Sequence, residues 1–152
     1  MNATTTADLS QTLNNLIETC IDGQKGFATA ADALENPQLK AELLSFSQQR
    51  REFADDLQGV LASSGESPAT TGSIAGTVHR GWINLRDAVT TRETYAILSE
   101  CERGEDHAVS AYQTASEAGL PRAADQVVKQ QFASIQAAHD RVRSLRNAAK
   151  PA

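Results

Sequence analysis

The residues of this chain that could do chemistry are polar side chains on otherwise apolar helical faces. Arg50, Glu105 and His139 each fall near the middle of a helical pattern, and so do Gln24 and Glu102. Burying an isolated charge costs several kcal/mol of lost hydration, so charged side chains are rarely buried without partners. We therefore expect these five residues to form a buried polar network in the core, or to hold a ligand there.

Glu102, Glu105 and His139 are the candidate metal ligands, because iron and manganese sites in helical bundles use carboxylates and imidazoles. A di-iron centre needs a Glu from each of two helices and a Glu-x-x-His from each of the other two. In this chain Gln136 stands where His139 would need a carboxylate three residues earlier, and residues 38–63 contain no histidine. Three ligands suit one metal ion and do not make a two-metal oxidase.

Arg50 argues against any metal, because a guanidinium is always protonated and repels a nearby cation. We expect Arg50 to fill the space that a metal would take and to pair with Glu105, with Glu102 assisting and His139 completing the network. Two alternatives stay open. One is a mononuclear iron or manganese site, and the other is a skewed helix that leaves these residues in solvent.

The elements that must position these residues are helices. The chain has 152 residues, is rich in alanine, and has only 5% aromatic residues, a composition that favours helix over strand. Its prolines fall between periodic stretches, where they mark helix ends. The apolar spacing predicts an all-α chain with helices over residues 8–35, 38–63, 73–89, 92–118 and 122–148.

The connections predict how these helices are arranged. Short links at residues 36–37 and 119–121 make their flanking helices antiparallel neighbours. The segment over about 64–91 is long enough to cross a bundle from end to end, so it allows the second and third long helices to run parallel. Trp82, in this crossover helix, is expected to cap the bundle, with His79 and Arg80 in solvent.

Within the first long helix, Gly23 and Gly26 are costly, by about 1 kcal/mol each relative to alanine. They predict either a very close neighbour or a bend. Glu18 and Asp22 are predicted to face away from the apolar stripe of the same helix. Cys20 lies on that stripe, where a thiol behaves as a small hydrophobic group.

Three strings resemble those of a bacterial four-helix-bundle family of unknown function in the ferritin-like superfamily: Gly72–Trp82, Glu100–Asp106 and Ala138–Arg143. The resemblance covers residues 8–148. It implies one ferritin-like four-helix-bundle domain over residues 1–152, with a long helical crossover between the second and third long helices. It also implies a bacterial cytoplasmic protein, and it carries no established activity.

Composition and motifs narrow the function. The formal charge of −5 disfavours nucleic acid and anionic membranes as partners, and no apolar run is long enough to span a bilayer. No phosphate-binding loop or nucleophile motif is present in the sequence. We expect a non-catalytic cytoplasmic protein without a cofactor, acting by self-association or partner binding through the crossover helix. The alternative is an iron- or manganese-dependent oxidoreductase, or an iron-handling protein.

Overall fold

The computed structural model describes residues 6–65 and 81–151, with side chains from Asp8 onward. This part of the chain is helical and contains no strand, which confirms the all-α prediction. The helices are α1 (Thr6–Ala33), α2 (Pro37–Ser63), α3 (Leu85–Thr91), α4 (Thr94–Ser116) and α5 (Arg122–Ala148). None of them combines the length and the apolar character that a membrane span requires.

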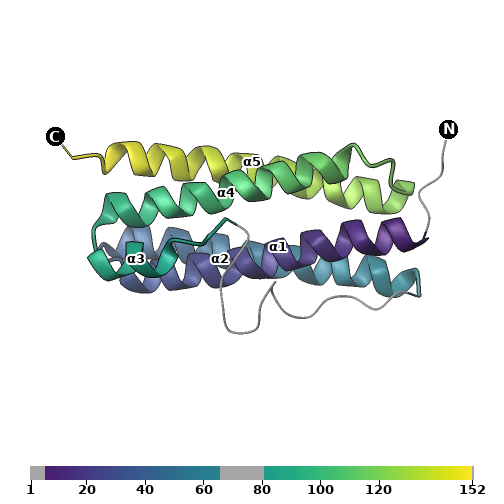
Figure 1. Cartoon of the computed structure of the whole chain (residues 1–152), viewed down its shortest axis with the longest axis horizontal. Coiled ribbons are helices and arrows are strands. Elements are labelled where there is room, and N and C mark those ends of the chain that lie inside the picture. The colour runs from purple at the N-terminus through teal and green to yellow at the C-terminus, as the bar shows by residue number, and fades with distance from the viewer. Residues whose placement is uncertain (1–5, 66–80, 152) are drawn as a thin grey trace.

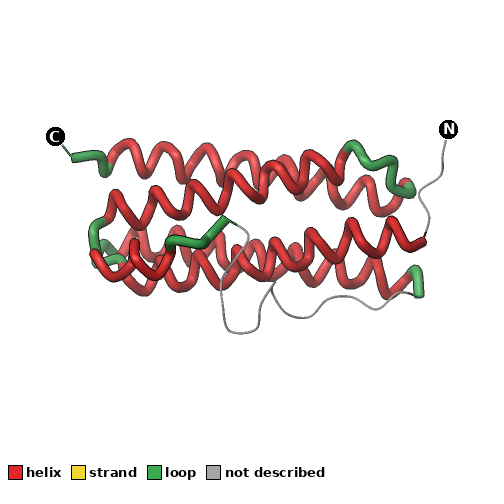
Figure 2. Tube along the Cα trace, viewed as in Figure 1, coloured by secondary structure: helices red, strands yellow, loops and turns green. Residues whose placement is uncertain are grey.

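The four long helices lie side by side (Figures 1 and 2). α1 and α2 form one tightly packed hairpin, α4 and α5 form a second, and α1 also packs against α4. The fourth seam, between α2 and α5, is the loosest of these contacts. Around the bundle the order is therefore α1, α2, α5, α4. Figure 1 shows that α2 and α4, which face each other diagonally, run in the same direction.

Local signals set the helix boundaries. Asn36 caps α2, because its side-chain oxygen accepts hydrogen bonds from the backbone N–H groups of Gln38 and Leu39 at 2.9 and 3.1 Å. Pro37 occupies the first helical position, where a missing N–H costs nothing. At the α4–α5 turn, Gly119 has a φ of 70°, a conformation that glycine adopts without strain.

The crossover helix is shorter than the sequence predicts. Residues 73–80, including His79 and Arg80, lie outside the described part of the chain. Within the described part, residues 81–84 are a turn and α3 begins only at Leu85. The prediction of helix over 81–84 is wrong because Gly81 has a φ of 99° and Trp82 inserts into the bundle.

Trp82 does not cap an end of the bundle but fills a slot between α1 and α4, at Gly26 and Gly104. Its side chain is buried and packs edge-on against Phe27, with 5.0 Å between ring centroids. The slot has glycines on both walls. A Cβ on Gly26 would lie 2.5 Å from the indole ring, and one on Gly104 would lie 2.6 Å from its Nε1. This contact explains the glycine that the sequence places at position 26.

Apolar residues fill the core in two clusters, one toward each end of the bundle. The cluster nearer the N-terminus of α1 includes Leu13, Leu57, Tyr112 and Val128. The other includes Phe27, Leu43, Leu98 and Val142.

A polar layer lies between the two clusters. Each long helix contributes a buried polar side chain to it: Asp22 from α1, Arg50 from α2, Glu105 from α4 and His139 from α5. Asp22, which the sequence predicts to face away from the apolar stripe of α1, is fully buried.

Candidate functional site

The centre of the polar layer is a salt bridge between Arg50 and Glu105. Both side chains are almost fully buried, at 1% and 0% exposure. The two guanidinium nitrogens meet the two carboxylate oxygens: Nη2 donates to Oε2 at 2.7 Å, and Nη1 donates to Oε1. This two-pronged geometry is the strongest form of an arginine–carboxylate contact. Because Arg50 is on α2 and Glu105 on α4, the pair joins the two diagonal helices through the core.

The surroundings of Arg50 are shaped to hold its side chain. A Cβ on Gly23 would lie 3.4 Å from Cγ of Arg50 and 3.5 Å from Nη1. The absence of a side chain at Gly23 therefore leaves room for the side chain of Arg50. The ring of Phe27 lies 5.3 Å from the guanidinium carbon, within the range of a cation–π contact. Nε donates to the side-chain oxygen of Gln49 at 3.2 Å. Three of the arginine nitrogens therefore have hydrogen-bond acceptors, which is what a buried charge requires.

The charge state of this pair follows from the same contacts. Burial would lower the pKa of Arg50, but the charge of Glu105 and the hydrogen bonds to it outweigh that effect. The pKa of the guanidinium therefore lies above its ordinary value. Arg50 therefore stays protonated opposite Glu105, whose carboxylate oxygens are both occupied.

Glu102 and His139 do not join this pair. Glu102 accepts a hydrogen bond from Nε of Arg143 at 2.9 Å and is also bound by Nη1 of Arg146. His139 places Nε2 at 2.5 Å from a carboxylate oxygen of Asp106. Its Nδ1 lies 3.5 Å from Asp140, and Gln24 is engaged at its backbone oxygen, by the hydroxyl of Ser47 at 2.8 Å.

Of the five residues expected to form one network, Arg50 and Glu105 bond to each other. Glu102 and His139 bond to other side chains, and Gln24 is bonded through its backbone oxygen. The reason is that the arginines at the end of α5 reach Glu102 across the α4–α5 seam. The sequence analysis missed these cross-helix pairs because they lie on the flanks of the helices and not on the apolar stripes. Across residues 6–65 and 81–151, no group of three or more His, Cys, Asp or Glu side chains is placed to hold a metal ion. Glu105, Glu102 and His139 are bonded to different partners, which are Arg50 for Glu105, Arg143 and Arg146 for Glu102, and Asp106 for His139.

A second buried polar cluster, centred on Tyr112, lies within the apolar cluster nearer the N-terminus of α1. The hydroxyl of Tyr112 donates to the side-chain oxygen of Gln131 at 2.7 Å and lies 3.1 Å from the sulfur of Cys20. The side-chain nitrogen of Gln131 donates to the backbone oxygen of Phe53 at 3.3 Å. These contacts connect α1, α2, α4 and α5 in one layer. The signal in the sequence is Gln131 itself, an amide on an apolar stripe.

Comparison with known proteins identifies the family. The family model described as Domain of unknown function (DUF2383) matches residues 8–118, which is most of the chain. The chain belongs to this family. No curated protein matches it. The expectation of a family of unknown function is thereby confirmed.

The DUF2383 segment contains both partners of the central salt bridge, because Arg50 and Glu105 fall within residues 8–118. α5 begins at Arg122, beyond that segment, and yet contributes Val128, Ile135 and Val142 to the core. The DUF2383 segment therefore contains both residues of the salt bridge, and α5, which lies outside that segment, completes the core.

The buried thiol of Cys20 predicts a loss of stability at alkaline pH. Burial raises the pKa of Cys20 from 9.0 to about 11, although its hydrogen bond with Tyr112 opposes the rise. A raised pKa in the folded state means that this thiol supports folding fully below pH 9, the unfolded value. That contribution is lost as the pH rises from 9 to 11. The loss is on the order of 3 kcal/mol.

Urea unfolding at several pH values, compared between the natural protein and Cys20→Ala, measures this contribution. The free energy of unfolding of Cys20→Ala should start lower but fall less steeply above pH 9. The pKa of Cys101 is also raised by burial, with no contribution from Cys20, so Cys101 ionises alike in both proteins and cancels from the comparison. Parallel pH profiles would contradict the prediction.

Proposed function

We propose that this protein is a non-catalytic ferritin-like four-helix bundle, bacterial and cytoplasmic, that acts by binding a protein partner or a second copy of itself. The observation that carries the proposal is the buried salt bridge of Arg50 and Glu105. It occupies the central layer between the two apolar clusters, and ferritin-like proteins hold their metal ions in the bundle core. The parallel diagonal helices α2 and α4 support the ferritin-like part of the proposal. The free, buried thiols of Cys20 and Cys101 support a reducing compartment.

The chemistry of the pair supports a scaffold in preference to a metal centre. A cation bound to Glu105 would have to displace a guanidinium that cannot lose its proton, and would leave that guanidinium buried without a partner. Both oxygens of Glu105 are already used, and the oxygens of Glu102 are held by two arginines. The charges of Arg50 and Glu105 thus balance each other, which suits a structural role.

The surfaces left for partner binding include the exit of the crossover. Ile83 has 70% of its side chain exposed, next to the buried Trp82 and Leu85 that anchor this segment. An anchored segment with an exposed apolar residue is a suitable contact for a partner chain. We therefore keep the crossover as one contact surface in this proposal.

Metal analysis tests the proposal against the oxidoreductase or iron-handling alternative. Protein purified without chelators should hold less than one equivalent of iron or manganese, and added Fe(II) or Mn(II) should leave its melting temperature unchanged. A ligand that binds the folded state tightly would raise it. Stoichiometric metal that is lost in Glu105→Ala, but kept in the surface control Asp87→Ala, would overturn the proposal.

A further inference from the structure

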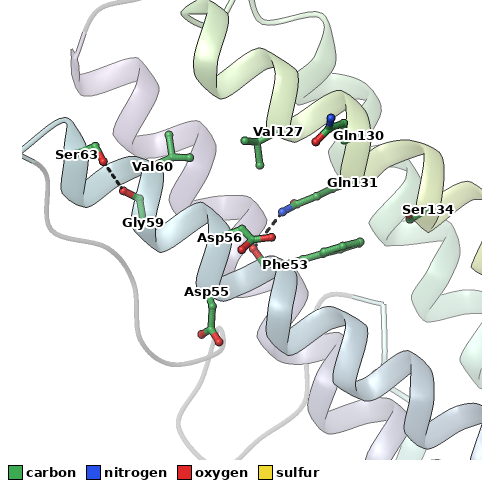
Figure 3. Close-up of a pocket in the computed structure, with 10 residues that line it drawn as sticks. All are labelled: Phe53, Asp55, Asp56, Gly59, Val60, Ser63, Val127, Gln130, Gln131 and Ser134. Atoms are coloured by element: carbon green, nitrogen blue, oxygen red, sulfur yellow. Dashed lines mark hydrogen bonds between the residues drawn. The ribbon is translucent and has the colours of Figure 1, made fainter.

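The seam between α2 and α5 is hollowed along much of its length. The larger hollow, of about 640 Å³, lies among Phe53, Val60, Val127 and Ser134 (Figure 3). A second hollow, of about 270 Å³, continues it beyond Ser134 to Phe46 and Arg141. Ser134 lines both hollows, so they adjoin along the same seam, and we call them together the α2–α5 groove.

Helical spacing gives the α2–α5 groove a regular lining. Phe46, Phe53 and Val60 are seven residues apart on α2, and all three are half-buried. Val127 and Ser134 have the same spacing on α5. A seven-residue repeat keeps side chains in line along a helix, which is the pattern that receives the knobs of another helix. From Glu42 to Ser63 the groove is about 30 Å long, the length of a helix of roughly 21 residues.

The seam on the opposite side of the bundle also has a space between two helices, and there a side chain of this protein fills it. There, between α1 and α4, the indole of Trp82 fills the space between the two glycines of the slot. No side chain among residues 6–65 and 81–151 fills the α2–α5 groove in this way. A row of half-buried apolar side chains among polar ones, with no side chain filling the space between the helices, favours a binding site for another chain.

The charges beside the α2–α5 groove specify the kind of partner. Asp55 and Asp56 line it from α2, both are exposed, and neither forms an ion pair with any residue that the structure describes. Among the described residues, Arg141 is the only basic one that lines the groove, and it is bound to Glu42 on the opposite wall, with Nη2 and Oε1 3.1 Å apart. The groove therefore combines apolar side chains with polar ones and is negative at one end. It repels an acidic segment and attracts a basic one.

We propose that the α2–α5 groove binds an amphipathic helix whose apolar face is flanked by lysine or arginine. The proposal deepens the proposed function, because it names the surface and the chemistry of the partner. Apolar side chains of the bound helix would pack on Phe53 and Val60, and its basic residues would meet Asp55 and Asp56. A second copy of this acidic chain is disfavoured as the occupant, since the formal charge of each copy is −5.

Binding of a designed peptide to the full-length protein tests the proposal. The probe is a labelled peptide of roughly 21 residues with leucine at heptad a and d positions and lysine on the flanks. Its controls are the same peptide with glutamate for lysine, and a scrambled peptide of identical composition. Fluorescence anisotropy should show that the lysine peptide binds, that added salt weakens it, and that neither control binds comparably. Equal binding of the scrambled peptide would overturn the proposal.

Paired variants separate the groove from general attraction to an acidic protein. Asp55→Asn with Asp56→Asn should weaken binding about 3- to 10-fold. The control, Asp32→Asn with Asp87→Asn, removes the same charge from exposed sites elsewhere and should leave affinity unchanged. Val60→Gln should weaken binding about tenfold. Leu44→Gln, an exposed apolar residue of α2 outside the groove, should not.

The outcomes are distinct from those of the metal test. Equal weakening by both aspartate pairs, or by both glutamine variants, would overturn the proposed groove and leave the non-catalytic assignment intact. The same holds if sedimentation finds a dimer that Val60→Gln dissociates, because the occupant is then a second copy. Stoichiometric metal at Glu105 would overturn the non-catalytic assignment without touching the peptide result.

Discussion

Replacing Arg50 with methionine should lower the free energy of unfolding by about 3–5 kcal/mol, because Glu105 is left as an unpaired charge in the core. Methionine has a similar length and fits the apolar path beside Gly23 and Phe27, so the loss reports the charge and not a cavity. Urea unfolding at neutral pH measures the effect.

Two further variants decide the origin of that loss. Arg141→Met also removes an arginine bound to a glutamate, but at an exposed pair, so little change in stability is expected. The double variant of Arg50→Met with Glu105→Leu removes both charges and should recover most of the stability, since a buried pair is often replaceable by apolar side chains. An Arg50→Met protein as stable as Arg141→Met would contradict the buried pair.

Replacing Gly104 with alanine should expel Trp82 from its slot and cost about 3 kcal/mol or more. The added methyl group would lie 2.6 Å from Nε1 and Cζ2 of the indole ring, and the wall at Gly26 is equally close. Trp82 is the only tryptophan of the chain, so its fluorescence reports the change directly. The emission maximum should move to longer wavelength as the indole meets water.

Gly59→Ala is the matched control for this prediction. Gly59 is also inside a long helix, but a Cβ there would meet nothing within 4 Å. Alanine at this position should leave the emission unchanged and raise the free energy of unfolding by up to about 1 kcal/mol. A Gly104→Ala protein that keeps the native emission maximum would show that the slot tolerates a methyl group.

The long helices were predictable because their apolar periodicity and their proline boundaries agree. The range 122–148 is that of α5, and 38–63 differs from α2 by the single residue Pro37. The crossover was not predictable in the same way. Ile74, Val78, Trp82 and Leu85 have helical spacing, but Trp82 is held by two glycines on other helices, and no local pattern contains that contact.

The candidate site was predictable only at its centre. Arg50 and Glu105 each sit on an apolar stripe, so burial alone makes them partners. Glu102 sits at the edge of its stripe and His139 within its own, and for both a small rotation of the helix decides whether the polar end of the side chain reaches the core or a neighbouring flank. The structure turns Glu102 toward Arg143 and Arg146, and His139 toward Asp106. Such rotations depend on the packing of all four long helices together and not on the sequence of one.

The diagonal contact of α2 with α4 has a consequence for assembly. Two helical hairpins with apolar faces can dock at several offsets along their length, since leucine against leucine is tolerant of sliding. A slip of one residue displaces Arg50 from Glu105 by about 1.5 Å along the axis, enough to break a two-pronged contact inside the core. In every misaligned form, Arg50 and Glu105 would be two buried and unpaired charges. We infer that the pair sets the axial register of the two hairpins, because it stabilises one offset between them and destabilises the others.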